Sequence, residues 1–349
     1  MNIAILTFYF AHNYGAMLQA YALKRYIESL TYMVNIVPYI PLRLKQGYSL
    51  SPFEKGISIK HRVYNTLFYL KRIRQAKKFE SFKKKMISAK EFTDSALVRD
   101  FLATCDLVVC GSDQIWNDEF SGKNNVYYGA DTDKPLISYA ACLGTQSLSS
   151  HQKECAAKNL PKFKFVSVRE NISRDLLKEY RNDINVVCDP VFLFKPNDWA
   201  RIEHNPGIKK NYLLLYLLED NPKLVSEAKK YADIHNLEIY EIHPILAFKH
   251  REIKKLRNVG PAEFVYLVHN ASAICTNSFH AVSFSILFEK ILLHIPNSKS
   301  PERTLNILNI AGIEFKNDKV VYDLNGSLKR LNDFIKASKD FLTNALKKA

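Results

Sequence analysis

The chain has 349 residues, a hydrophobic fraction of 47% and a formal net charge of +15. This length exceeds what a single hydrophobic core usually supports, and the composition is not that of a disordered chain, so we expect two folded domains. No apolar run approaches the roughly 20 residues that are needed to cross a bilayer. The six cysteines form no CxxC pair, which disfavours a disulfide framework or a zinc site and favours reduced, buried thiols.

In the first half of the chain, short apolar stretches alternate with segments of helical periodicity. This alternation is typical of parallel sheets that are covered by helices on both faces. Residues 1–10 lack the basic start and the small-residue cleavage site of a secretory signal, so we expect the chain to begin with a strand. The strands predicted for this half are residues 3–8, 34–37, 107–110, 136–140, 165–168 and 185–187.

A strongly basic segment interrupts the alternation and is expected to be a helical insertion. Residues 51–90 contain twelve Lys or Arg and two acidic residues. Such an excess attracts nucleic acid, anionic membranes or phosphorylated small molecules. Nucleic acid is not expected as a partner, because no recognition motif accompanies the charge. A solvated helix face is the alternative interpretation of this segment.

The polar residues 203–210, which include Pro206 and Gly207, interrupt the pattern before it restarts at residue 212. We therefore place the N-terminal domain at residues 1–195 and the C-terminal domain at residues 196–349. The second half is predicted to end in a long helix within 328–346. Two doubly wound, Rossmann-like α/β domains enclose a cleft between them, and ligands bind beyond the carboxyl ends of such strands. The strands predicted for the second half are residues 212–218, 238–242, 271–275 and 291–295.

Two polar motifs follow strands of the first domain. In the turn NYGAMLQA, Gly15 lets the backbone approach a ligand at a helix N-terminus, although a plain strand-to-helix turn would look the same. The second motif is rich in hydrogen-bonding groups around a tryptophan, which suits a sugar. The alternative is that its aspartate caps a helix and its tryptophan packs in the core. The candidate residues of this motif are Ser112, Asp113, Gln114, Trp116 and Asn117.

A third motif, SVRE, ends a strand with an arginine. Arg169 can contact a carboxylate or phosphate through two N–H groups, or it can pair with Glu170. Asp189 closes the next strand and is either a turn former or a ligand contact. Further along the chain, Arg303 lies at the start of a predicted helix, where it either reaches the cleft or is solvated.

The most informative motif joins the strand at 271–275 to an apolar helix. Thr276, Asn277, Ser278 and His280 bring hydroxyl, amide and imidazole groups to a helix N-terminus, where phosphate binds readily. The helix dipole disfavours the charged form of His280 unless an anion is bound. We therefore expect an enzyme that binds an anionic substrate here, with a purely structural histidine as the alternative.

Six ordered motifs give the sequence a family resemblance. They are NYGAMLQAYAL, GSDQIWN, YAACLGT, SVRE, DPVFL and TNSFHAVSFSI, and the correspondence runs from about residue 2 to about residue 312. On these motifs the sequence resembles the polysaccharide pyruvyl transferases. The resemblance implies two Rossmann-like domains similar to the GT-B glycosyltransferases, with an acceptor side and a donor side. The implied activity transfers pyruvate from phosphoenolpyruvate to two hydroxyls of a glycan sugar as a ketal.

The resemblance also implies roles for individual residues. His280 and Arg169 match family residues that contact phosphoenolpyruvate. Many members carry an arginine two residues before the histidine, whereas this chain has Ser278, so Arg303 or Arg169 has to supply the missing cation. We expect His280 to be the acid or an electrophile on the phosphate side, and Asp113 to be the base or a ligand of the acceptor. Phosphoenolpyruvate is the expected donor substrate, and neither a metal nor a further cofactor is expected.

The expected acceptor is a bacterial surface glycan or its lipid-linked precursor. A lipid carrier would bring the protein to the inner membrane face, where each basic residue of 51–90 contributes about 1 kcal/mol of attraction. We therefore expect a cytoplasmic protein with peripheral contact to an anionic membrane surface. Two alternatives stay open: a GT-B-type glycosyltransferase that uses a nucleotide sugar, and a non-catalytic binding protein of a glycan pathway.

Overall fold

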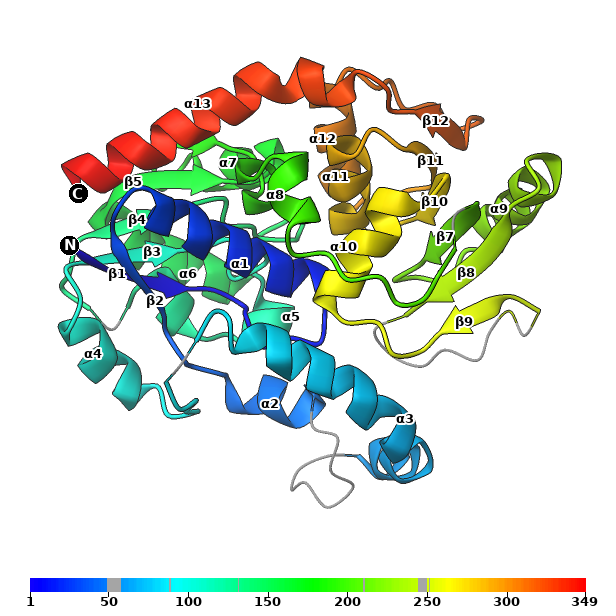
Figure 1. Cartoon of the computed structure of the whole chain (residues 1–349). Coiled ribbons are helices and arrows are strands. Elements are labelled where there is room, and N and C mark those ends of the chain that lie inside the picture. Colours follow the sequence, from blue (N-terminus) through cyan, green and yellow to red (C-terminus); the bar gives the residue numbers. More distant parts are fainter. Residues whose placement is uncertain (49–57, 88, 131, 210, 244–249, 251) are drawn as a thin grey trace.

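Two six-stranded sheets form the two halves of the computed structural model, which describes residues 1–48, 58–87, 89–130, 132–209, 211–243, 250 and 252–349 (Figure 1). The first sheet is parallel throughout and has the order β2-β1-β3-β4-β5-β6. Its central strand β3 is apolar and buried along its whole length, as a parallel strand covered on both faces must be. The strands are β1 (Asn2–Leu6), β2 (Met33–Ile36), β3 (Leu107–Cys110), β4 (Leu136–Ser138), β5 (Phe163–Val168) and β6 (Ile184–Val186).

The second sheet has the order β12-β11-β10-β7-β8-β9, with β12 antiparallel to its neighbour and the other strands parallel. The ten predicted strands are thus confirmed, with small shifts of their bounds. Strands β9 and β12 were not predicted, because both are three-residue edge strands and are too short to show apolar periodicity. The strands are β7 (Tyr212–Tyr216), β8 (Glu238–Ile242), β9 (Lys254–Leu256), β10 (Ala273–Thr276), β11 (Ile291–His294) and β12 (Val321–Asp323).

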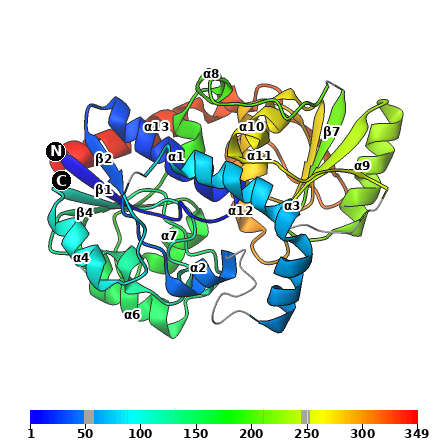
Figure 2. The same cartoon turned by 60° about the horizontal axis from the view of Figure 1, so that its bottom comes forward.

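Helices cover both faces of both sheets (Figures 1 and 2), and in the part of the chain that the structure describes none combines the length and hydrophobicity of a membrane-spanning segment. All six cysteines are free and buried. The basic insertion forms most of α3, although residues 51–57 and 88 of that insertion lie outside the described residues. The helices are α1 (Tyr14–Ser29), α2 (Leu42–Tyr48), α3 (Ile59–Lys83), α4 (Ala96–Ala103), α5 (Asp118–Ser121), α6 (Ser150–Asn159), α7 (Asn171–Leu177), α8 (Pro196–Ala200), α9 (Pro222–Ile234), α10 (Pro261–Asn270), α11 (Phe279–Leu287), α12 (Glu302–Ile310) and α13 (Ser327–Lys348).

The last helix, α13, connects the two halves. It begins beside the second sheet and runs back over the first, so the two termini lie near each other (Figure 1). Ser338, in the middle of α13, accepts a hydrogen bond from the backbone N–H of Cys188 at 2.9 Å. Leu331, Leu342 and Leu346 on its buried face are fully covered. The C-terminal segment of the predicted second domain therefore packs partly on the first.

Tyr14, the first residue of α1, joins the halves at the cleft and is fully buried. Its ring stacks on Phe264 of α10 and Phe79 of α3, with ring centroids 4.8 Å and 5.4 Å away. Its hydroxyl donates to the Val259 carbonyl at 3.3 Å and accepts from Gln75 Nε2 at 3.2 Å. Burial raises the pKa of Tyr14 well above its ordinary value, so the hydroxyl stays protonated. One side chain thus ties α1 and α3 to the second half.

Replacing this contact should weaken the joint between the two halves. We expect Tyr14→Ala to lower the free energy of unfolding by about 3–5 kcal/mol, the usual cost of deleting a buried aromatic ring. Tyr14→Phe keeps the ring and should cost about 1 kcal/mol, because it removes the hydrogen bonds of the hydroxyl to Val259 and Gln75. Urea denaturation measures both values. Tyr322→Ala is a matched control, since Tyr322 is equally buried but belongs to the second sheet.

Hydrogen exchange distinguishes a loss of the contact between the two halves from a general loss of stability. Tyr14→Ala should increase exchange in α1 and α10 together, whereas Tyr322→Ala should increase it in the second half. An unfolding free energy of Tyr14→Ala equal to that of the wild type would contradict this account.

Candidate active site

The two sheets face each other at the points where their strand order reverses. In the first sheet this point lies between β1 and β3, and in the second it lies between β7 and β10. Ligands of doubly wound sheets bind outside the carboxyl ends of strands at such switch points. The loops that follow these four strands, together with α2, α1 and α12, enclose a cavity of about 100 Å³. The fold itself therefore places a pocket between the two halves.

His280 lies in the first turn of α11 and lines this cavity, although its side chain is largely covered. Its ring packs directly against the start of α1 at Gly15. A Cβ atom on Gly15 would lie 2.0 Å from His280 Nδ1, so no other residue fits without moving one of the two helices. Asn13 caps α1 by accepting from the N–H of Gly15 at 2.9 Å. The NYGAM motif thus leaves space for the imidazole of the other domain to pack against the start of α1.

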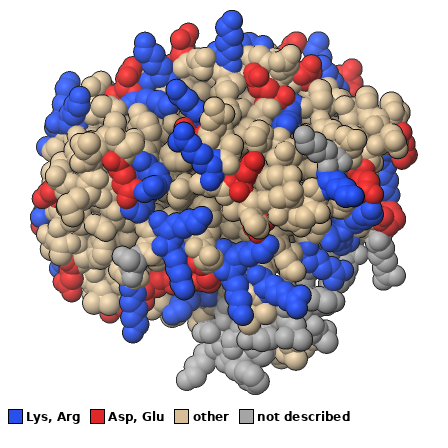
Figure 3. All heavy atoms as spheres, in the orientation of Figure 1, with Lys and Arg blue, Asp and Glu red and all other residues tan. Residues whose placement is uncertain are grey.

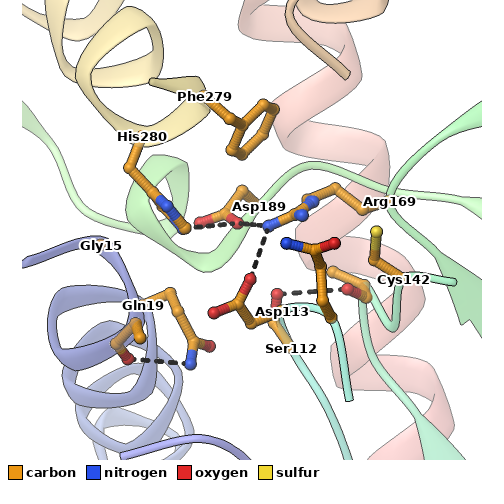
Figure 4. A network of polar contacts seen from close by, with 12 residues as sticks. Gly15, Gln19, Ser112, Asp113, Cys142, Arg169, Asp189, Phe279 and His280 are labelled. Atoms are coloured by element: carbon orange, nitrogen blue, oxygen red, sulfur yellow. Dashed lines mark hydrogen bonds and ion pairs between the residues drawn. The ribbon is translucent and has the colours of Figure 1, made fainter. Parts of the chain in front are cut away.

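Asp189 links His280 to Arg169 (Figure 4). Its Oδ2 lies 3.5 Å from His280 Nε2 and accepts from Arg169 at 2.8 Å. Burial opposes ionisation of Asp189, but the neighbouring imidazole and guanidinium outweigh it and hold the pKa of Asp189 well below its usual range. His280 Nε2 forms no hydrogen bond to any described residue. This nitrogen therefore faces a carboxylate and has no hydrogen-bond partner among the described residues.

Arg169 lies behind the cavity wall, where three carboxylates surround it. Besides Asp189, Arg169 contacts Glu170 at 3.2 Å and Asp113 at 3.7 Å. The residue is buried and does not line the cavity. Its Nη2 forms no hydrogen bond to any described residue, so direct contact of Arg169 with an anion stays a prediction. Its role in the structure is to fix Asp189 and Asp113.

Arg303 is the cation that faces the cavity. It reaches from α12 across the ring of Phe279, with its guanidinium carbon 5.1 Å from the ring centroid. Arg169 lies over the same ring at 4.2 Å. The Nε of Arg303 is 3.5 Å from Glu170 Oε1 and forms no hydrogen bond within the described part of the chain. Arg303 therefore keeps hydrogen-bonding capacity for a ligand.

The residues of the motif after β3 differ in their position relative to the cavity. Asp113 and Gln114 line the cavity. Trp116 is fully buried, stacks on Tyr128 and donates to the Tyr127 carbonyl at 2.9 Å, so the expectation that its ring supports a sugar is not met. This tryptophan packs in the core instead.

Several predicted residues serve the framework of the site. Ser112 is buried and donates to the Ala140 carbonyl, and Asn117 rather than Asp113 caps the helix that follows, α5. Thr276 donates to the Tyr216 carbonyl at 2.6 Å. Asn277 accepts from the N–H of Leu218 and donates to the Glu219 carbonyl, which fixes the loop after β7.

In the same motif, Ser278 lines the cavity directly before α11, and Phe279 lines it next to His280. The sequence analysis assigned no role to Phe279, nor to Leu44 and Tyr48 of α2, which also line the cavity. Phe279 lies inside a quoted motif and could have been found there. The two α2 residues carry no such signal, since they belong to no motif.

The buried charge of Asp189 gives a stability prediction. Asp189→Asn preserves the shape but removes the charge between Arg169 and His280, and we expect the free energy of unfolding at pH 7 to fall by about 3 kcal/mol. Because the pKa of Asp189 is lowered on folding, its contribution is present above the unfolded-state pKa of about 3.9 and is lost as the pH falls further. The difference between variant and wild type should therefore shrink below about pH 4.

Urea denaturation across this pH range provides the measurement. The matched control is Asp183→Asn, because Asp183 is exposed and pairs with Arg181 at the surface. The loss in the control should stay below about 1 kcal/mol. A loss for Asp189→Asn that is no larger than the loss in the control would show that Asp189 is not held as a charged group.

Solved structures with the same architecture are epimerases of a nucleotide sugar. The UDP-GlcNAc 2-epimerase of Methanocaldococcus jannaschii, in complex with UDP-GlcNAc and UDP, matches with a TM-score of 0.57 at 15% sequence identity, and the match covers 100% of both chains. The UDP-GlcNAc 2-epimerase of Neisseria meningitidis, bound to UDP-GlcNAc, matches with a TM-score of 0.55 at 10% identity and the same coverage. These likenesses confirm the GT-B-like fold.

Sequence comparison identifies the family. No curated protein matches the chain. The family model described as polysaccharide pyruvyl transferase matches residues 13–299, which include all six motifs quoted above. Most of the chain is covered by this match. The chain therefore belongs to the polysaccharide pyruvyl transferase family.

Proposed function

We propose that this protein transfers pyruvate from phosphoenolpyruvate to a sugar of a bacterial surface glycan or its lipid-linked precursor, as a ketal. The observation that carries the proposal is the position of His280. Its imidazole lines the inter-domain cavity at the N-terminus of α11 and is oriented by Asp189. A proton donor beside an anion-binding helix end is what activation of an enol phosphate requires.

In the proposed reaction, two sugar hydroxyls add in turn to C2 of phosphoenolpyruvate, and phosphate leaves this carbon between the two additions. Protonation of the methylene carbon of phosphoenolpyruvate makes C2 electrophilic, and a sugar hydroxyl adds there as its proton is removed. The C–O bond to phosphate then breaks, a second hydroxyl adds to C2, and its proton leaves with inorganic phosphate. The products are a ketal with a methyl and a carboxylate group, and one phosphate. The carbon atoms undergo no net oxidation or reduction, so the proposed reaction needs no redox cofactor.

The cavity residues take roles that follow from their positions. His280 protonates the methylene carbon or the departing phosphate. Asp113, held in place by Arg169, removes the proton of the attacking hydroxyl. Arg303 and the free N–H groups at the start of α11 bind the phosphate or the carboxylate of the donor. Arg169 acts through the carboxylates that it holds.

We also propose that the basic face of α3 contacts an anionic membrane surface. Lys and Arg side chains gather over α3 on the face shown in Figure 3. Arg74 and Lys77 in the second half of this helix, and Lys84 and Lys85 just beyond its end, are exposed. Each exposed basic residue near an anionic bilayer adds about 1 kcal/mol of attraction, which would hold the cleft close to a lipid-linked acceptor.

Donor use is the decisive test of the proposed function. Purified protein is incubated with phosphoenolpyruvate and a panel of mono- and disaccharide acceptors, and phosphate release and ketal formation are followed. His280→Ala should lower the rate by about 10²- to 10⁴-fold, the usual contribution of a positioned acid or base. His204→Ala is the matched control, because His204 is exposed on the loop after α8.

Two results would overturn the proposal. One is release of a nucleoside diphosphate from nucleotide sugars with no phosphate released from phosphoenolpyruvate. The other is unchanged ketal formation by His280→Ala.

A further inference from the structure

A second, larger cavity shares a wall with the catalytic cavity. Its volume is about 450 Å³, compared with about 100 Å³ for the catalytic cavity. The residues common to both are Gln114, Phe120, Leu218, Phe279 and Arg303. A molecule in the larger cavity therefore contacts the same side chains as a molecule beside His280.

The two volumes differ in the size of ligand that they can hold. The catalytic cavity is small enough to suit a three-carbon phosphate ester and too small for a glycan. The larger cavity falls in the range of about 300–1,000 Å³ that is typical for small-molecule ligands of drug size. A disaccharide is of that size, whereas a single sugar ring would leave part of the space to water.

The side chains that line the larger cavity suit an uncharged, hydroxyl-rich ligand. Asn297, Ser298 and Ser300 contribute amide and hydroxyl groups from the loop after β11. The charged residues of the lining, Glu119, Glu219, Lys299 and Arg303, are two acids and two bases, and 3.6 Å separates Glu119 Oε1 from Lys299 Nζ. Sugar rings bind where apolar side chains lie beside neutral hydrogen-bonding groups.

One amide pair in this cavity is fixed before any ligand binds. Gln114 Oε1 accepts from Asn117 Nδ2 at 3.0 Å, so the Nε2 of Gln114 is the group left for a ligand. Gly144 makes room for this pair, because a Cβ there would lie 2.0 Å from Gln114 Oε1. A donor held in one orientation loses little conformational entropy on binding.

We propose that the larger cavity, which we call the acceptor chamber, binds two consecutive uncharged sugar residues of the acceptor. The sugar to be modified meets the donor at the wall formed by Phe279 and Arg303, and the second sugar lies against the loop at 297–300. This inference rests on the proposed function and names the substrate class of that site.

The test compares two acceptors that end in the same accepting sugar, one a monosaccharide and one a disaccharide, with saturating phosphoenolpyruvate. We expect the disaccharide to have a KM at least about tenfold lower, because the second ring adds contacts in a preformed chamber. Ser300→Trp fills the chamber and should raise the disaccharide KM to that of the monosaccharide. Ser150→Trp, at an exposed position on α6 outside both cavities, is the matched control.

A second variant covers the case in which Ser300→Trp does not fold. Gln114→Met keeps the length of the side chain but removes both amide groups, and it should raise the KM for both acceptors. Phosphoenolpyruvate binding, followed by the thermal shift that it causes, should be unchanged in Ser300→Trp, because Ser300 lines the larger cavity and not the catalytic one.

The outcomes distinguish failure of the chamber from failure of the proposed function. Equal KM values for the two acceptors, with no effect of Ser300→Trp or Gln114→Met, overturn the chamber while phosphate release from phosphoenolpyruvate continues. Absence of phosphate release with every acceptor, together with no thermal shift by phosphoenolpyruvate, overturns the proposed function and the acceptor assignment with it.

Discussion

A buried carboxylate between a guanidinium and an imidazole holds the cleft in its observed form. Asp189 and Arg169 come from the first sheet, and His280 comes from the second, so this contact crosses from one half of the chain to the other. A buried charge needs oppositely charged or hydrogen-bonding partners, and removal of one partner leaves the remaining buried charge uncompensated. The orientation of His280 is therefore tied to the docking of the two halves.

The topology explains why these residues meet. A switch point leaves a crevice at the carboxyl ends of two neighbouring strands, and this chain places the switch point of one sheet opposite that of the other. Gly15 allows α1 and α11 to approach each other closely, because it has no side chain and the imidazole of His280 packs directly against its backbone. The site is thus built from short loops that follow rigid strands and from residues of α1, α2, α5, α11 and α12.

The sequence predicted the parts of the fold that depend on apolar periodicity, and it missed those that depend on contacts distant in the chain. Buried strands such as β3 are visible as apolar runs, whereas β9 contains two lysines in three residues and is defined by its pairing with β8. The same limit applies to the site. Motifs located His280 and Asp113, but a motif cannot show which face of Trp116 is covered or that three carboxylates enclose Arg169.

Because three carboxylates surround Arg169, the negative charge of the proposed donor has to be balanced by another cation. Three carboxylates and two arginines lie in or behind the cavity wall, so the protein's own charges nearly cancel there. Ser278 stands where the family resemblance implies a further cation, and it is almost fully buried. Arg303 is the arginine on the cavity wall, and it approaches from a different helix, α12, over the ring of Phe279. Under the proposed function, the anion is consequently bound between α12 and the start of α11, beside the imidazole of His280.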